Sequence, residues 1–152
     1  MSAPENGKVC FCFGHRTAPD HLLSVLIDEA ERHVREFGVQ EFVVGHYGAF
    51  DTLAARAVQA VKAHCGDVRL TLLLPYYPTA RPFSLPDCFD GSLYPPIERV
   101  PKRLAIVCAN RWMVDHSDFL ISFVRYPGST ARELLEYARR RARRGELTIT
   151  NL

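Results

Sequence analysis

Apolar positions along the chain follow two different periodicities. Four short runs are almost continuously apolar, as expected of strands that are buried on both faces of a parallel sheet: residues 8–13, 41–45, 68–74 and 118–124. Four longer segments place apolar residues three and four positions apart, which predicts amphipathic helices: residues 19–37, 51–63, 102–114 and 129–144. Residues 147–150 are a candidate for a further strand at the edge of the sheet.

Strands and helices alternate along the chain, and this order predicts an α/β fold with a mainly parallel sheet. We expect residues 8–13 to be the central strand, between 41–44 and 118–124, because the turns after these strands must share one pocket. A chain of 152 residues supports one domain. Residues 75–101 hold seven of the ten prolines and several aromatic residues. We interpret them as a loop insertion, either a lid over a binding site or a packed covering segment.

Composition narrows the function classes only slightly. The net charge is +2, which neither favours nor excludes nucleic acid as a partner. Residues 132–144, however, contain six arginines against two glutamates. This run is either a solvated helix end or, less favoured because aromatic residues are not interleaved with it, a nucleic-acid contact.

Cysteine usage and apolar run lengths predict a cytoplasmic protein. The five cysteines form no CxxC pair, so we expect buried free thiols in a reducing compartment and no metal site. The longest apolar runs are too short to span a bilayer, so no membrane is expected as a partner. Residues 1–8 are polar and do not resemble a signal peptide.

Three glycine-bearing turns each join a predicted strand to a predicted helix. They contain Gly14, His15 and Arg16; Gly45, Gly48 and Asp51; and Gly128, Ser129 and Thr130. Free N–H groups at helix N-termini favour anions, and glycine lets a phosphate approach the backbone closely. Together the turns predict a site for a phosphorylated ligand, although each glycine could also be a simple connector. None completes a GxGxxG or Walker A motif.

Individual residues in these turns allow two interpretations each. Arg16 is either a phosphate clamp or a surface residue, and His15 either bonds a ligand or holds its own turn. Asp51 is either a ligand-binding group or an ordinary helix N-cap. Trp112 is expected in the core or in a subunit interface.

The same turns resemble a known family. Residues 12–16 (CFGHR), the stretch 45–51 that closes in Asp51, the segment 110–121 (NRWMVDHSDFLI) and the turn 128–130 are similar, in order, to motifs of the YpsA-like proteins. These proteins belong to the SLOG superfamily, together with DprA/Smf DNA-processing proteins and LOG-type nucleotide hydrolases. The resemblance covers most of the chain. It implies a single Rossmann-like three-layer domain over residues 1–152 that binds a nucleotide or an ADP-ribose-like ligand, with Asp51 on ribose hydroxyls.

In the LOG-type hydrolases an arginine and a glutamate act on the N-glycosidic bond of nucleoside 5′-monophosphates. Arg111 and Glu133 are the matching candidates for catalysis here. Two departures stand out: Arg111 precedes Met113 by two positions rather than three, and Ser129 replaces a glycine. One residue of helix rotates a side chain by about 100°.

We therefore expect a nucleotide-binding sensor or carrier without appreciable catalysis. The first alternative is a nucleoside 5′-monophosphate phosphoribohydrolase. The second is a DprA-like nucleic-acid module that uses the arginines of residues 132–144. The apolar surface of residues 102–114, with Val107, Trp112 and Met113, and the pairing common among SLOG proteins predict a homodimer or larger assembly.

Overall fold

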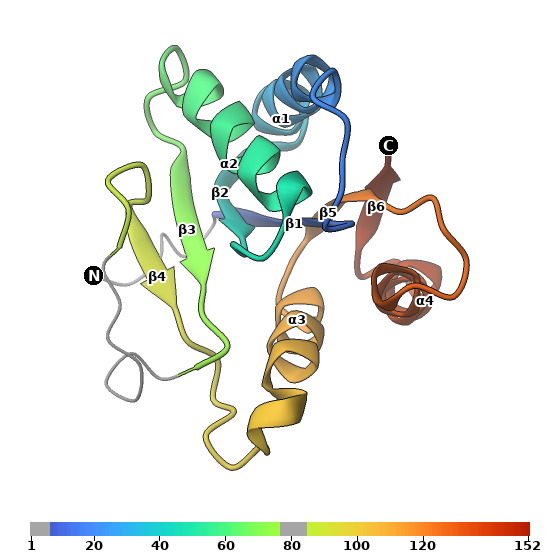
Figure 1. Cartoon of the computed structure of the whole chain (residues 1–152). Coiled ribbons are helices and arrows are strands. Elements are labelled where there is room, and N and C mark those ends of the chain that lie inside the picture. The colour runs from blue at the N-terminus through green and yellow to red at the C-terminus, as the bar shows by residue number, and fades with distance from the viewer. Residues whose placement is uncertain (1–6, 77–84) are drawn as a thin grey trace.

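Six parallel strands form one sheet in a computed structural model that describes residues 7–76 and 85–152 (Figure 1). In chain order the strands are β1 (Lys8–Gly14), β2 (Val39–Val44), β3 (Arg69–Leu73), β4 (Gly91–Leu93), β5 (Phe119–Phe123) and β6 (Thr148–Asn151). The helices are α1 (Leu22–Phe37), α2 (Ala49–Lys62), the short 3₁₀ helix η1 (Lys102–Leu104), α3 (Ala105–Asp115) and α4 (Thr130–Arg143).

The sheet has the order β4-β3-β2-β1-β5-β6, which confirms the predicted central position of the first strand. Phe11 in β1 pairs with Val43 in β2 on one side and with Leu120 in β5 on the other. The chain builds outward from β1 to β4 and then returns to the opposite side of β1. The strand order therefore reverses at β1 and β5, and ligands of open parallel sheets bind at the carboxyl ends of strands at such a point.

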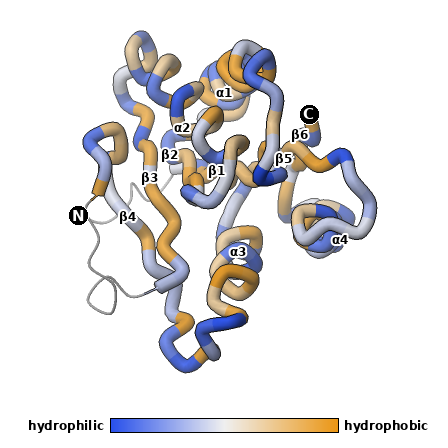
Figure 2. The backbone as a smooth tube through the Cα atoms, viewed as in Figure 1, coloured by the Kyte–Doolittle hydropathy of each residue, from blue (hydrophilic) through white to orange (hydrophobic). Residues whose placement is uncertain are grey.

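Helices cover both faces of the sheet, as the predicted three-layer architecture requires. α1 and α2 lie on one face, and α3 and α4 lie on the other (Figure 1). The pleat of β1 sends Cys10 and Cys12 into the first core and Phe11 and Phe13 into the second. Apolar residues accordingly dominate the strands in the middle of the molecule (Figure 2).

The proline-rich segment contains a strand that the sequence pattern did not predict. β4 pairs in parallel with β3, with Ser92 opposite Leu72. Asp90 fixes its start, because the carboxylate accepts a hydrogen bond from the Leu70 N–H at 2.7 Å and pairs with Lys62. Three residues between proline-rich flanks are too few for a periodicity to register. Residues 77–84 of the insertion lie outside the described residues, as do residues 1–6.

The cysteines depart in part from the expected burial. All five are free, but only Cys10 and Cys12 are buried; Cys65, Cys88 and Cys108 are half-buried. Burial raises the pKa of the Cys10 thiol well above its ordinary value. Within the described ranges, the helices are too short or too polar to cross a membrane.

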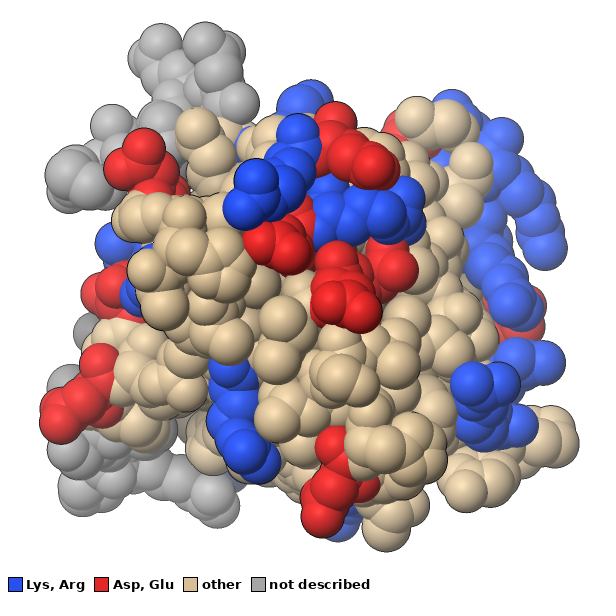
Figure 3. Space-filling model, turned by 90° about the horizontal axis from the view of Figure 1, so that it is seen from above, with Lys and Arg blue, Asp and Glu red and all other residues tan. Residues whose placement is uncertain are grey.

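Basic side chains gather along the right-hand edge of Figure 3, the side on which α4 and β6 lie in Figure 1. Several of the α4 arginines have acidic or carbonyl partners. Arg139 pairs with Glu136 at 2.7 Å, and Arg144 approaches Glu146 at 3.7 Å. Arg141 donates to the carbonyl of Val114. These contacts offset much of the charge and tie the end of α4 to the molecule, which supports a structural role for the run.

His33 is a polar residue in the core between α1 and the sheet. Its side chain is fully buried, and its ring packs edge-on against Phe37 and Phe119. Nδ1 donates to the Glu29 carbonyl at 2.7 Å, whereas Nε2 is, among the described residues, a buried nitrogen with no hydrogen-bond partner. Burial lowers the pKa of His33 below its ordinary value of 6.5, outweighing the opposite effect of Glu29.

We predict that His33→Leu raises the free energy of unfolding by about 1 kcal/mol at pH 8, because it removes an unpaired buried acceptor. The gain grows as the pH falls below 6.5, since the unfolded wild-type chain then binds a proton that folded His33 resists. Urea denaturation of both proteins at pH 5 and pH 8 measures this difference. His21→Asn, at an exposed histidine, is the control and leaves the pH dependence unchanged.

Candidate functional site

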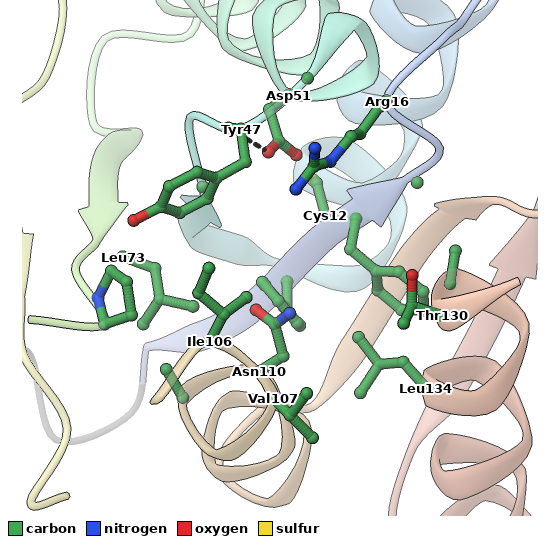
Figure 4. A pocket seen from close by; sticks show the side chains of 18 of the residues that line it. Cys12, Arg16, Tyr47, Asp51, Leu73, Ile106, Val107, Asn110, Thr130 and Leu134 are labelled. Atoms are coloured by element: carbon green, nitrogen blue, oxygen red, sulfur yellow. Dashed lines mark hydrogen bonds between the residues drawn. The ribbon is translucent and has the colours of Figure 1, made fainter. Parts of the chain in front are cut away.

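A pocket of about 290 Å³ opens at the carboxyl ends of the central strands (Figure 4). The turns after β1 and β2 and the first turn of α2 form one wall. The middle of α3 and the first turn of α4 form the other wall. The pocket therefore lies where the strand order reverses, as the topology requires.

Most of the residues singled out in the sequence line this pocket. They are Gly14, His15, Arg16, Gly45, Gly48, Asp51, Arg111, Thr130 and Glu133. Gly128 and Ser129 do not line it; they border an adjoining, more open hollow beside α4. Ser129 caps α4 instead, accepting from the Arg132 N–H at 3.1 Å and donating to the Tyr126 carbonyl at 2.9 Å. The expectation that Gly128 shares the cavity with the other turns is thus wrong.

Two glycines allow the turns to pack against neighbouring groups. The Ala49 N–H donates to the Arg16 carbonyl at 2.7 Å, and a Cβ on Gly48 would lie 2.5 Å from the Arg16 Cα. A Cβ on Gly14 would lie 2.6 Å from the Phe50 ring. A side chain at Gly48 would push the two turns apart, and a side chain at Gly14 would displace the Phe50 ring of α2. Both glycines therefore shape the pocket.

His15 connects the turn after β1 to the turn after β5. Its Nε2 accepts hydrogen bonds from the backbone N–H groups of Arg125 at 2.8 Å and Tyr126 at 3.3 Å. Accepting at Nε2 requires a neutral ring with its proton on Nδ1, and burial lowers the pKa of His15 in keeping with this. Of the two interpretations, the geometry therefore favours the structural one.

Asp51 is a half-buried carboxyl group that lines the pocket. It lies in the first turn of α2, where Gly48 occupies the N-cap position, so Asp51 is not itself the N-cap. Its Oδ2 accepts from the Tyr47 N–H at 3.0 Å and would lie 3.1 Å from a Cβ on Gly45. Burial raises its pKa from 3.8 to about 6, against the effect of the Tyr47 hydrogen bond. Figure 4 shows Asp51 and Arg16 extending toward one another at the pocket rim.

Apart from Arg111, the residues of the wall formed by α3 were missed in the sequence. Ile106 and Val107 supply an apolar surface, and the Asn110 amide points into the pocket beside them (Figure 4). Leu134 of α4 and Leu73 at the end of β3 extend this surface. The helical spacing of the apolar residues in α3 predicts that they face the protein interior. It does not predict that they line a cavity. Asn110 does begin the segment 110–121, which carries part of the family resemblance.

One group of potential metal ligands is found in the described part of the chain, away from the pocket lining. Donor atoms of Glu31, His64 and Cys65 lie within 4.8 Å of one another between α1 and the end of α2. Glu31 is already hydrogen bonded to His64 at 2.7 Å and to Arg35 at 3.1 Å. Glu31, His64 and Arg35 therefore form a cluster of ion pairs on the surface that joins α1 to the end of α2.

No protein-family model matches the sequence, and no curated protein matches it. Solved structures do. One is the molybdenum cofactor binding protein from the phototrophic bacterium Rippkaea orientalis, with a TM-score of 0.61 and 12% identity over 98% of this chain and 79% of that chain. Another is the molybdenum cofactor carrier protein from Chlamydomonas reinhardtii, with a TM-score of 0.57 and 10% identity over 95% and 90%. The chain therefore has the Rossmann-like α/β fold of these proteins.

We predict that Asp51→Asn stabilises the protein at pH 8. Ionising Asp51 in the folded state is unfavourable up to about pH 6, so the wild type loses stability as the pH rises from 4 to 6. Asparagine retains an acceptor for the Tyr47 N–H without the charge. We expect a gain of about 1–3 kcal/mol at pH 8 that vanishes at pH 4. Chemical denaturation at the two pH values measures it, and an equal gain at both would contradict the assignment.

Proposed function

We propose that this protein binds a small phosphorylated heterocyclic ligand, a nucleotide or nucleotide-like cofactor, and acts as a sensor or carrier without appreciable catalysis. The observation that carries the proposal is the convergence of two glycine turns and the first turn of α4 on one pocket. Membership of the SLOG superfamily, close to the YpsA-like proteins, is part of the same proposal.

The two sides of the pocket suit the two halves of such a ligand. The N-terminal turn of α2, the Thr130 end of α4 and the exposed Arg16 favour a phosphate group. Ile106, Val107 and Leu134 offer an apolar surface for a flat ring. Asp51 and Asn110 lie between these regions and can bond to hydroxyl or ring N–H groups.

The molybdenum cofactor is a second ligand to consider. Two solved structures with this fold are named for binding or carrying it. It also joins a phosphate to a heterocycle, so the same division of the pocket would serve it. Carriage rather than turnover agrees with a site whose best-fixed residues, Gly48 and His15, hold its turns together by contacts with backbone groups.

The second candidate function is hydrolysis of nucleoside monophosphates, and one observation supports it. Arg111 and Glu133, paired by the resemblance to LOG-type hydrolases, line the same pocket from α3 and α4. Both side chains are exposed at its mouth, and within the described residues neither is held in place by a side-chain hydrogen bond. Because catalysis loses about 100-fold for a misplacement of about 1 Å, we favour binding over turnover.

A homodimer or larger assembly stays a prediction. Leu104 and Val107 are 43% and 40% exposed at the start of the α3 region, so they offer apolar surface that a second copy could cover. Trp112, expected in the core or an interface, is half-buried and stacks on His116 with ring centroids 3.9 Å apart.

Ligand binding is tested by thermal unfolding with AMP, GMP and isolated molybdenum cofactor as separate probes. A probe at 100 times its Kd stabilises the folded state by about 2.7 kcal/mol, which raises Tm by roughly 5–10 °C for a chain of this size. Arg16→Gln should remove most of the shift, since it deletes the cation at the pocket rim. Arg56→Gln, on the exposed side of α2, should keep it. Failure of all three probes to shift Tm would refute the proposal.

Catalysis is tested by incubating the protein with each nucleoside monophosphate and looking for free base by chromatography. We expect none above the buffer blank, because Arg111 is displaced by one helical position from its counterpart in the hydrolases. Base release that Glu133→Gln abolishes and Glu36→Gln preserves would establish the hydrolase instead.

A further inference from the structure

Three side chains of different chemistry meet where α1 packs against the end of α2 (Figure 1). The donor atoms of Glu31, His64 and Cys65 all lie within 4.8 Å of one another. Glu31 belongs to α1, whereas His64 and Cys65 follow the last turn of α2. None of the three lines the pocket at the carboxyl ends of the strands. What this cluster binds is therefore a question separate from the proposed function.

The core beneath the cluster fixes the backbone on both sides of it. Ala30 in α1 and Val61 in α2 are buried in the same apolar core, and Cys65 packs against that core. The Val61 carbonyl accepts hydrogen bonds from the N–H groups of His64 at 3.1 Å and Cys65 at 2.8 Å. Because these contacts anchor the backbone, only side-chain torsions have to change when an ion enters between the donors.

The spacing of the donors suits a tetrahedral metal ion. Zn²⁺ lies about 2.0–2.3 Å from its oxygen, nitrogen and sulfur ligands, so the ligand atoms of such a site lie roughly 3.3–3.7 Å apart. His64 Nε2 lies 2.7 Å from Glu31 Oε1. The Cys65 sulfur lies within 4.8 Å of the donor atoms of both other residues. One separation has to widen and the longest has to shorten, each by a small rotation of an accessible side chain.

The surroundings leave the three donors available. The hydrogen bonds that Glu31 accepts, from His64 and from Arg35 at 3.1 Å, both go to Oε1. Oε2 accepts none from any residue that the structure describes. Arg35 can therefore keep its bond to Oε1 and orient the carboxylate, as outer hydrogen bonds do at metal sites. Cys65 is a free, half-buried thiol, and the His64 side chain is 49% exposed, so an ion reaches the cluster from solvent.

The donor set selects the class of metal. Magnesium and calcium take oxygen ligands almost exclusively, whereas imidazole and thiolate suit Zn²⁺ and the neighbouring divalent transition metals. One carboxylate, one imidazole and one thiolate therefore favour zinc. Three protein ligands leave the fourth corner of the tetrahedron to water.

We propose that Glu31, His64 and Cys65 form a Zn²⁺ site that joins α1 to the end of α2. The ion takes the place of the proton between Glu31 and His64, whose ring then carries its proton on Nδ1. It also displaces the Cys65 thiol proton to solvent. Cysteine spacing, on which the expectation of no metal site rested, does not detect such a site, because Glu31 comes from another helix 33 residues before His64.

Titration of the untagged protein with Zn²⁺ alone, followed by isothermal calorimetry in a buffer without chelators, tests the site. We expect one ion to bind per chain. Cys65→Ser and His64→Gln should each weaken binding by at least about tenfold, because each removes a ligand. The matched controls are Cys108→Ser, at a half-buried free thiol of α3, and His21→Gln, at an exposed histidine, and both should leave the affinity unchanged.

Co²⁺ in place of Zn²⁺ identifies the sulfur ligand directly. We expect sulfur-to-cobalt charge-transfer absorption in the near ultraviolet that Cys65→Ser abolishes and Cys108→Ser preserves. The Tm of each variant without metal verifies that it is folded. Absence of Zn²⁺ binding would overturn the site, and so would binding that neither Cys65→Ser nor His64→Gln weakens, since the ion would then be held adventitiously elsewhere on the surface.

Discussion

The pocket depends on one backbone contact between two turns. The Arg16 carbonyl accepts the first free N–H of α2, and only the absence of a side chain at Gly48 permits the approach. This contact sets the distance between the carboxyl ends of β1 and β2, and it places the Arg16 side chain at the rim opposite Asp51 (Figure 4). If the two turns moved apart, the N-terminus of α2 would lose its position beside the β1 turn.

His15 extends the same constraint across the point where the strand order reverses. Its ring joins the β1 turn to the backbone at Arg125 and Tyr126, so hydrogen bonds link the turns after β1, β2 and β5. Such rigidity suits binding, because a site that is already formed pays little ordering entropy when a ligand enters. Asp51 illustrates the opposite tendency, since desolvation raises the pKa of its half-buried carboxyl group to about 6, and ionising that group weakens the fold that holds it. Ionisable residues that have strongly shifted pKa values and reduce the stability of the fold are typical of functional sites.

The two walls of the pocket differ in origin and in chemistry. The wall made by the glycine turns presents backbone N–H groups and Arg16, and it resembles other anion sites at the ends of parallel strands. The α3 wall presents Ile106, Val107 and Asn110, and it leads through Arg111 to the charged hollow on α4. A ligand that joins a phosphate group to a flat ring matches the two walls of the pocket.

The amino-acid sequence by itself determined the α/β architecture, the central position of the first strand and most of the turn residues at the site. These features follow from local periodicity and from glycine at strand ends, both of which are visible in a single chain. Tertiary structure decided the rest. Helical spacing could not say that Asn110 faces a cavity or that Ser129 caps α4 outside it, because both depend on how α3 and α4 lie against the sheet. The strand β4 was equally hidden, since its three residues are ordered by pairing with β3 and by Asp90 rather than by their own pattern.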